Sequence, residues 1–198
     1  QDRSEDLTVR LQFPSVRVNV VRYEIAMTPN RLHNRLNLDA RLTFIPEEAH
    51  KYLGVELDRR FVVDEAFLDE EPCSFTRQEN RIRFNFLEAV EPGRERTLRV
   101  RYHGSPVTFH PNYTALLSVW YPVPWRKLKT ENQRWVQVDN DLFEAEIVLN
   151  LQPGQQGAFA GDLVEVRGEN GGRIERWRTL YPVESMQVFW GKYDSVEK

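Results

Sequence analysis

The stretch Val16–Thr28, which reads V-R-V-N-V-V-R-Y-E-I-A-M-T, places apolar and polar side chains in near-regular alternation. A period of two sends successive side chains to opposite faces of a strand, so this stretch predicts one long β-strand. The stretch Leu36–Ile45, L-N-L-D-A-R-L-T-F-I, alternates in the same way, and Pro29-Asn30 ends the first run. We therefore expect a long β-hairpin with an open loop around His33.

Shorter alternating runs separated by turn residues continue to the C-terminus. Residues 168–172, G-E-N-G-G, predict a hairpin turn because Asn-Gly and Gly-Gly tolerate positive φ. The one candidate helix is Pro46–Tyr52, about two turns with Pro at the first helical position. About ten to twelve strands and little helix predict an all-β fold, a large antiparallel β-sandwich or set of packed, saddle-like sheets. The other expected strands are Leu53–Leu57, Arg60–Leu68, Pro72–Thr76, Arg81–Phe86, Thr97–Tyr102, Leu142–Leu151, Gly157–Arg167, Arg173–Leu180 and Ser185–Tyr193.

Composition excludes several classes of protein. Of the 198 residues, 40% are hydrophobic and 12% aromatic, enough to form a buried core rather than a disordered chain. A net charge of −3, with both signs interspersed, provides no long-range attraction for nucleic acid or anionic membrane. No apolar run approaches the length that spans a bilayer, and the polar first ten residues are not a signal peptide. The single Cys73 excludes an intrachain disulfide.

The residues that usually carry chemistry form no catalytic or metal-binding pattern. The four histidines, His33, His50, His103 and His110, do not build an H-E-x-x-H motif. The spacing of His103 and His110 favours ordinary turn histidines over a metal site. Cys73 has no base nearby in sequence and is expected to be a small core side chain. The sequence therefore predicts no catalytic residue, no cofactor-binding residue and no metal ligand in this chain.

The aromatic run around residue 120 is the most unusual feature. Residues 104–135 contain four prolines and three of the five tryptophans, which predicts irregular chain with buried rings. Trp120, Tyr121, Trp125 and Trp135 are the candidate residues for a domain interface, because Trp and Tyr dominate binding energies. The alternative is that these rings fill the seam between two sheets, as large amphipathic side chains often do. The glycosylation sequon Asn112-Tyr113-Thr114 does not favour either alternative.

The order of several short motifs resembles the N-terminal β-domain of the aminopeptidase N family of zinc metallopeptidases. Val21–Pro29 is similar to that domain's Y-x-I-x-L-x-P strand, and Arg96–Gly104 to its L-x-I-x-Y-x-G strand. Trp120-Tyr121-Pro122 resembles the family's central W-Y-P, and Phe143–Leu149 the strand that follows it. Gly157–Val164 and Trp177–Tyr193 are similar to the closing segments, so the resemblance covers about residues 21–194.

The resemblance implies a division of the chain and a non-catalytic role. Residues 1–20 would lead into the first strand, residues 21–194 would form the aminopeptidase N-terminal-like domain, and residues 195–198 would begin a linker. The family's H-E-x-x-H helix and G-x-M-E-N loop are missing, and Leu116–Val119 lacks the Gln that helps hold the substrate's amino end in active members. The family's F-P-C-x-D-E-P stretch is also not matched after Pro122. The chain alone is therefore not expected to be an enzyme, and zinc would belong to a separate catalytic domain of an active parent.

Two functions follow from these observations. In the first, the chain docks on a zinc-peptidase domain of the same polypeptide and shapes the substrate entrance, and peptide substrate is a further candidate partner. In the second, it is a stand-alone or membrane-tethered protein-interaction module that uses an aromatic surface, including as an extracytoplasmic part of a bacterial membrane protein. A weaker third reading is a carbohydrate-binding sandwich. Neither nucleic acid nor direct membrane insertion is expected.

Overall fold

The computed structural model describes residues 16–30, 35–105, 108–109, 113–116, 119–125, 127–129, 135–137, 141–169 and 171–192. Within these residues, every regular element is a β-strand, which confirms the all-β fold class. The strands form one eight-stranded sheet, two four-stranded sheets and a two-stranded ribbon.

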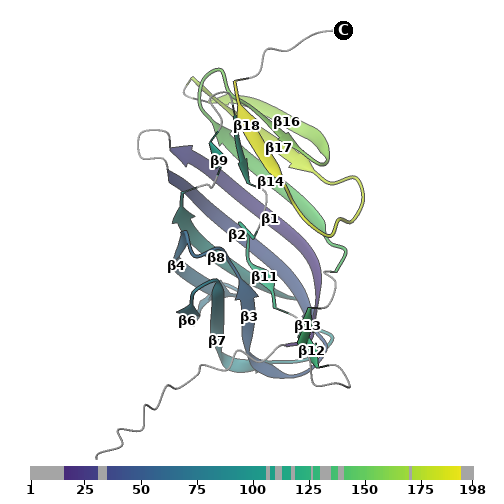
Figure 1. Cartoon of the computed structure of the whole chain (residues 1–198). Helices are drawn as coiled ribbons and strands as arrows, with labels where there is room; N and C mark the ends of the chain where they lie inside the picture. Colours follow the sequence, from purple (N-terminus) through teal and green to yellow (C-terminus); the bar gives the residue numbers. More distant parts are fainter. Residues whose placement is uncertain are drawn as a thin grey trace, which may run out of the picture.

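The eight-stranded sheet, called the large sheet below, is built from both halves of the chain (Figure 1). Its spatial order is β16-β17-β14-β1-β2-β8-β4-β5. The bounds are β1 Val18–Asn30, β2 Arg35–Pro46, β4 Phe61–Leu68, β5 Glu71–Pro72, β8 Arg96–Gly104, β14 Glu144–Leu151, β16 Asp162–Glu169 and β17 Gly172–Arg178.

The predicted long hairpin forms the centre of the large sheet. β1 and β2 pair antiparallel from Val18 opposite Pro46 to Asn30 opposite Arg35, with one register shift between Val20 and Arg22. The other side of β1 pairs with β14 in parallel, an arrangement that alternation alone did not predict. The remaining pairs of the large sheet are antiparallel.

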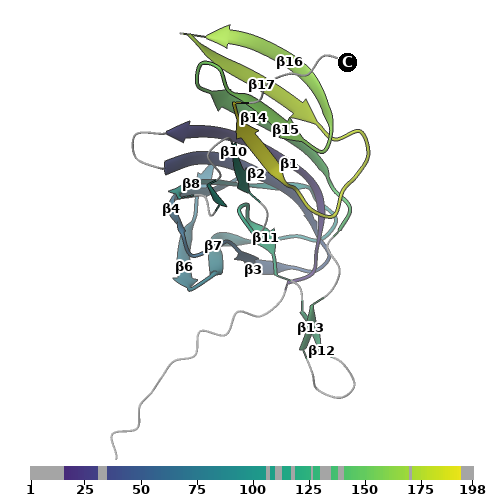
Figure 2. The same ribbon diagram turned by 45° about the horizontal axis from the view of Figure 1, so that its top comes forward.

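Two smaller sheets lie on one side of the large sheet (Figures 1 and 2). The β18 sheet has the order β15-β18-β10-β9 and the β3 sheet has the order β11-β3-β7-β6. Their bounds are β3 His50–Glu56, β6 Ser74–Gln78, β7 Arg81–Val90, β9 Thr108–Phe109, β10 Tyr113–Leu116, β11 Val123–Pro124, β15 Gln156–Phe159 and β18 Val188–Gly191. The ribbon joins β12 Lys127–Lys129 to β13 Trp135–Gln137.

The core lies between the large sheet and these two sheets. Alternate positions of β2, from Leu36 to Phe44, are buried, whereas Asn37 and Arg41 between them remain accessible. The same alternation along β8 and β14 gives the large sheet one covered inner face and one solvated outer face. Buried side chains from all three sheets, such as Phe44, Phe84 and Trp190, belong to one hydrophobic cluster.

The structure corrects three expectations about local structure. The predicted helix Pro46–Tyr52 is wrong, because Pro46 ends β2 opposite Val18 and the chain enters β3 at His50. The single strand expected over Gly157–Arg167 is two strands, β15 in the β18 sheet and β16 in the large sheet. The break falls at Gly161, where a Cβ atom would lie 2.2 Å from the carbonyl oxygen of Arg178, so only glycine allows this close crossing. The single strand expected over Pro72–Thr76 is likewise two strands, β5 Glu71–Pro72 in the large sheet and β6 Ser74–Gln78 in the β3 sheet.

The turn expected at residues 168–172 and the irregular chain expected over residues 104–135 agree with the structure. Residues 168–172 form the turn between β16 and β17, and Gly171 has a φ of +79°. The described parts of residues 104–135 hold five short strands of two to four residues, β9 to β13, separated by non-strand chain.

Candidate functional site

The segment Val119–Trp125 follows β10 and includes β11. It lies between the large sheet and the smaller sheets. Trp120, Tyr121 and Trp125 retain only 1%, 4% and 7% of their side-chain exposure. The Trp120 Nε1–H donates a hydrogen bond of 3.0 Å to the carbonyl oxygen of Met186, which precedes β18. This bond satisfies the polar atom of a ring that is otherwise surrounded by the core.

Two tyrosines of the large sheet hold the backbone of this segment. The Tyr102 hydroxyl, on β8, donates to the carbonyl oxygen of Trp120 at 2.9 Å. The Tyr23 hydroxyl, on β1, donates to the carbonyl oxygen of Pro122 at 2.8 Å. Both side chains project from the inner face at positions where the sequence alternation had predicted only an apolar stripe. Because irregular backbone lacks partners of its own, these bonds satisfy carbonyl groups that burial would otherwise leave unpaired.

The rings of the segment form edge-to-face contacts with one another and with the large sheet. Tyr121 contacts Tyr23 with a centroid separation of 5.1 Å, and Trp120 with one of 5.2 Å. Tyr23 also meets Phe143 at 4.7 Å. Burial raises the pKa of Tyr121 to about 12, against the weaker effect of a hydrogen bond with the Met186 backbone. Burial likewise raises the pKa of Tyr102 well above its ordinary value, so both phenols stay neutral at physiological pH.

Trp125 lies against the β3 sheet instead. Its backbone N–H donates to the carbonyl oxygen of Gly54 at 2.8 Å, and the guanidinium of Arg81 stacks 3.1 Å from the ring centroid. Trp135 contributes backbone to β13, opposite Lys129, and its side chain lies outside the described residues.

The structure therefore brings Trp120 and Tyr121 together and places Trp125 apart from them. All three rings face the protein's own interior, which agrees with the sheet-seam alternative for these residues. A role of Trp120, Tyr121, Trp125 and Trp135 in a domain interface stays a prediction. The three buried rings would act in such an interface by fixing the position of the segment, rather than by direct contact of their faces.

The outer face of the large sheet carries charged side chains that pair across strands. The β2–β8 ion cluster consists of Asp39, Glu65, Arg99 and Arg101. Arg99 meets Asp39 at 2.6 Å, and Arg101 bridges Glu65 at 2.8 Å and Asp39 at 3.4 Å. Partial burial opposes the ionised form of Asp39, but the hydrogen bond and charge of Arg99, with Arg101, lower its pKa overall.

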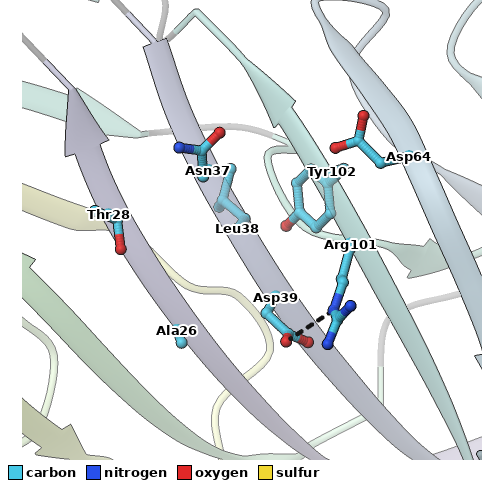
Figure 3. Close-up of a pocket in the computed structure, with 8 residues that line it drawn as sticks. All are labelled: Ala26, Thr28, Asn37, Leu38, Asp39, Asp64, Arg101 and Tyr102. Carbon is cyan, nitrogen blue, oxygen red and sulfur yellow. Dashed lines mark hydrogen bonds and ion pairs between the residues drawn. The ribbon is translucent and has the colours of Figure 1, made fainter.

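A shallow hollow of about 300 Å³ adjoins this cluster (Figure 3). It spans β1, β2, β8 and the start of β4, and its polar atoms come from residues that include Thr28, Asn37 and Asp64. Asp64 also accepts a hydrogen bond of 2.8 Å from Nδ1 of His103, if that nitrogen carries the proton. Of the charged groups that line the hollow, Asp39 pairs with Arg101, and Asp64 pairs with His103.

A second charged group lies farther along the outer face. The β14–β17 ion cluster consists of Glu146, Glu165, Arg176 and Arg178. Glu146 forms ion pairs with Arg178 at 2.8 Å and with Arg176 at 3.0 Å. Arg176 also forms an ion pair with Glu165 at 3.2 Å. Cross-strand pairs of this kind favour the register of a sheet whose outer face has no apolar cover.

One buried carboxylate was not identified from sequence. Glu175 lies on the inner face of β17 with 1% exposure, between the large sheet and the β18 sheet. Its oxygens accept bonds from Trp177 Nε1 at 3.0 Å, the Gly157 backbone N–H at 2.9 Å and Arg173 Nε at 2.5 Å. In the stretch R-I-E-R-W at residues 173–177, the charged Glu175 occupies a strand position whose side chain points inward. A charge at such a position was the feature of the sequence that could have identified it.

The remaining chemical candidates are structural in character. Burial raises the pKa of the Cys73 thiol to about 11, so the reactive thiolate is scarce at neutral pH. His50 is buried and its Nδ1 lies 2.7 Å from the carbonyl oxygen of Glu48. Among the described residues, no three His, Cys, Asp or Glu side chains form a group that could hold a metal ion. His33 and His110 lie outside the described residues, so the spacing argument on His103 and His110 stays a prediction.

Comparisons with known proteins connect this fold to a peptidase class. No protein-family model matches the sequence, and neither does any curated protein. The structure is similar to that of an M1 zinc metallopeptidase from Deinococcus radiodurans, with a TM-score of 0.72 and 16% identity. A mutant of an M1 zinc metallopeptidase from that organism, bound to a Tyr-Ser-Ala substrate, gives 0.70 at 17% identity, and a two-domain mutant bound to L-tryptophan gives 0.71 at 17%.

The match covers very different shares of the two chains. In each case 90% of this chain is covered, but only 44% of the metallopeptidase chain. The chain thus has the fold of one part of a larger zinc metallopeptidase and spans less than half of that enzyme's length. This agrees with the expected resemblance at the level of fold. No helix long and apolar enough to cross a membrane occurs among the described residues.

Proposed function

We propose that this chain is a non-catalytic β-domain of an aminopeptidase-like protein, which docks on a zinc-peptidase domain and shapes its substrate entrance. The observation that carries the proposal is the fold likeness, which includes nearly all of this chain and less than half of an M1 zinc metallopeptidase. The sequence also lacks the H-E-x-x-H motif on which zinc peptidase chemistry depends.

The residues that the structure describes do not fit a catalytic zinc ion. The described residues hold no group of three potential metal ligands, and the acids of the outer face are already paired with arginines. We therefore derive no catalytic step in this chain. Residues 21–194 would form the domain, and zinc would be held by the partner domain of an active parent.

The described geometry supports a docking role for the 104–135 region. Trp120, Tyr121 and Pro122 are fixed from both sides, by Tyr23 and Tyr102 of the large sheet and by the Met186 carbonyl. A segment that is irregular yet rigid can present loop backbone to a neighbour at little cost in ordering entropy. In this proposal Trp120, Tyr121 and Trp125 fix the position of the segment that meets the partner domain, and Trp135 is the further candidate residue of the interface.

The first experiment measures catalysis directly. The purified chain is incubated with aminoacyl substrates, with and without a metal chelator, and we expect no release of amino acid in either case. Turnover that scales with the amount of this chain and survives the chelator would contradict the proposal.

The second experiment tests docking in the polypeptide encoded by the complete gene. An H-E-x-x-H motif within roughly 150 residues after Lys198 would identify the expected partner domain. Hydrogen–deuterium exchange is then compared between the 198-residue chain and the longer protein. We expect added protection within residues 104–135 and none along Leu98–His103 of β8, whose backbone is already paired on both sides. Unchanged exchange at residues 104–135 in a protein that contains the motif would contradict docking.

The alternative function is a protein-interaction module, stand-alone or tethered to a membrane. Leu180 and Tyr181, two neighbouring apolar side chains that are 64% and 79% exposed, are among the described residues that favour it. Transmembrane helices in the gene without an H-E-x-x-H motif would support this alternative.

A further inference from the structure

The two edges of the large sheet differ in how they are protected. At one edge, β5 has only two residues, Glu71 and Pro72, and Pro72 has no N–H to offer a further strand. At the other edge, β16 has eight residues and, among the described residues, pairs only with β17. Figures 1 and 2 show β16 as the outermost strand, with no strand beyond it.

The β16 edge also carries apolar side chains that the rest of the chain leaves uncovered. Leu163, Val164 and Val166 are 39%, 48% and 47% exposed. Glu175 on β17, directly opposite Val166, is by contrast 1% exposed. The cover provided by the β18 sheet therefore ends at β17, and β16 extends beyond it. Long apolar edge strands are templates for pairing with another strand.

The hairpin fixes which backbone groups of β16 face outward. Glu169 and Gly172 pair across a two-residue turn, so they form the hydrogen-bonded pair next to the turn. Hydrogen-bonded and non-hydrogen-bonded pairs alternate along an antiparallel ladder. Gly168 and Val166 are therefore in non-hydrogen-bonded positions toward β17, and their N–H and C=O groups point away from the sheet.

We propose that β16 pairs antiparallel with β16 of a second copy of this chain, centred on Val166. In this register the outward N–H and C=O groups of Val166 meet those of Val166 in the second copy. Glu165, which also contacts Arg167 and Arg176 of its own chain, then lies opposite Arg167 of the second copy, and symmetry provides this opposite-charge pair twice. The result is one continuous sheet across the two copies.

The irregular part of β16 fits the same register. The register shift between Leu163 and Glu165 leaves Val164 without a partner on β17. In the proposed pairing Val164 lies opposite Gly168 of the second copy, which has no side chain and has open space around its Cβ position. The two Val166 side chains become direct cross-strand neighbours, a β-branched pair that suits a sheet. This proposal is independent of the docking function above.

The first test removes the outward hydrogen bond without disturbing the fold. Sedimentation velocity of the 198-residue chain over a range of concentrations should show a reversible monomer–dimer equilibrium. Val166→Pro deletes an N–H that faces away from β17, a position where edge strands tolerate proline, and should weaken dimerisation about tenfold or more. The matched control is Leu87→Lys on β7, an 81% exposed residue outside the proposed interface, which should leave the equilibrium unchanged. A wild-type chain that remains monomeric at all concentrations would overturn the proposal.

The second test exchanges charges and reports the register. Glu165→Arg places two arginines opposite each other at both symmetric positions, and Arg167→Glu places two glutamates there. Each variant alone should dimerise about tenfold more weakly. An equimolar mixture of the two should recover a heterodimer, because each arginine then meets a glutamate of the other variant. Thermal melting verifies that each variant is folded. No weakening in either variant, or no recovery in the mixture, would refute the Val166-centred register.

Discussion

The two faces of the large sheet are made by the same strands but stabilised by different chemistry. On the inner face, rings and tyrosine hydroxyls hold irregular chain, as where Tyr102 binds the carbonyl of Trp120 at 2.9 Å. On the outer face, arginines and carboxylates pair in solvent, as where Arg101 meets Glu65 at 2.8 Å with both side chains about half exposed. The inner contacts therefore determine stability, whereas the outer ones chiefly favour register, because solvent weakens exposed ion pairs.

Trp120 is the largest fully buried side chain, and its loss should reduce stability the most. Trp120→Ala should lower the free energy of unfolding by about 3–5 kcal/mol, because it leaves a cavity and an unpaired Met186 carbonyl. Urea unfolding followed by circular dichroism measures this change. Tyr181→Ala, at a 79% exposed residue, is the control and should change stability by less than about 0.5 kcal/mol. Similar losses in both variants would show that Trp120 is not a core residue.

A smaller effect should come from the buried carboxylate. Glu175→Gln keeps the shape but removes the charge that Arg173 and the Trp177 N–H share, and should cost about 1–3 kcal/mol. Glu146→Gln alters a carboxylate that also binds two groups, Arg176 and Arg178, on the outer face, and should cost less than about 1 kcal/mol. Urea unfolding measures the loss of unfolding free energy in each variant. Equal losses in the two variants would contradict the expectation that inner-face contacts contribute more to stability than outer-face ion pairs.

The tyrosine anchors should have a lesser effect. Tyr102→Phe removes one hydroxyl and leaves the Trp120 carbonyl unpaired, at about 1–2 kcal/mol. Tyr23→Phe does the same to Pro122. Because both hydroxyls hold one segment, the double variant should lose a different amount from the sum of the two single losses. Additive losses would indicate that the two anchors act independently.

A small, pH-dependent effect on stability is expected at Asp39 on the outer face. The folded-state pKa of Asp39 lies below its ordinary value of 3.8, although burial opposes this, because Arg99 and Arg101 stabilise the carboxylate. Its contribution to stability is therefore complete above the unfolded pKa and is lost as pH falls through the folded pKa. Asp39→Asn should flatten the loss of stability below about pH 4 by at most about 1 kcal/mol. Urea midpoints at several pH values test this, and an unchanged acid dependence would contradict it.

The central hairpin could be predicted from sequence because its pattern is long and its inner face is completely covered. Thirteen residues of β1 alternate against twelve of β2, and a slip by one residue would expose every buried side chain. Pro46–Tyr52 was predicted incorrectly, because a local preference for helix is weaker than the pairing of His50–Glu56 with β7. Local sequence contains no information about that distant partner.

The candidate site was predictable only in part. The burial of the aromatic run followed from its composition, but Tyr23 and Tyr102 gave no sign of binding carbonyls about a hundred and about twenty positions away, because such contacts depend on tertiary structure. The division of residues 157–167 between two sheets had a local signal in Gly161, although its meaning required the neighbouring Arg178 backbone. Alternation also gives no direction to a strand pair, so the parallel contact of β1 with β14 could not be foreseen.

That parallel contact has a consequence for how the chain reaches its native state. Arg22 pairs with Glu144, so one side of β1 waits for a partner until more than half of the chain has been synthesised. Closing so long a loop is slow, and an unpaired strand side is open to aggregation in the meantime. In a nascent chain, one side of Val18–Asn30 therefore stays unpaired until β14 Glu144–Leu151 has been synthesised.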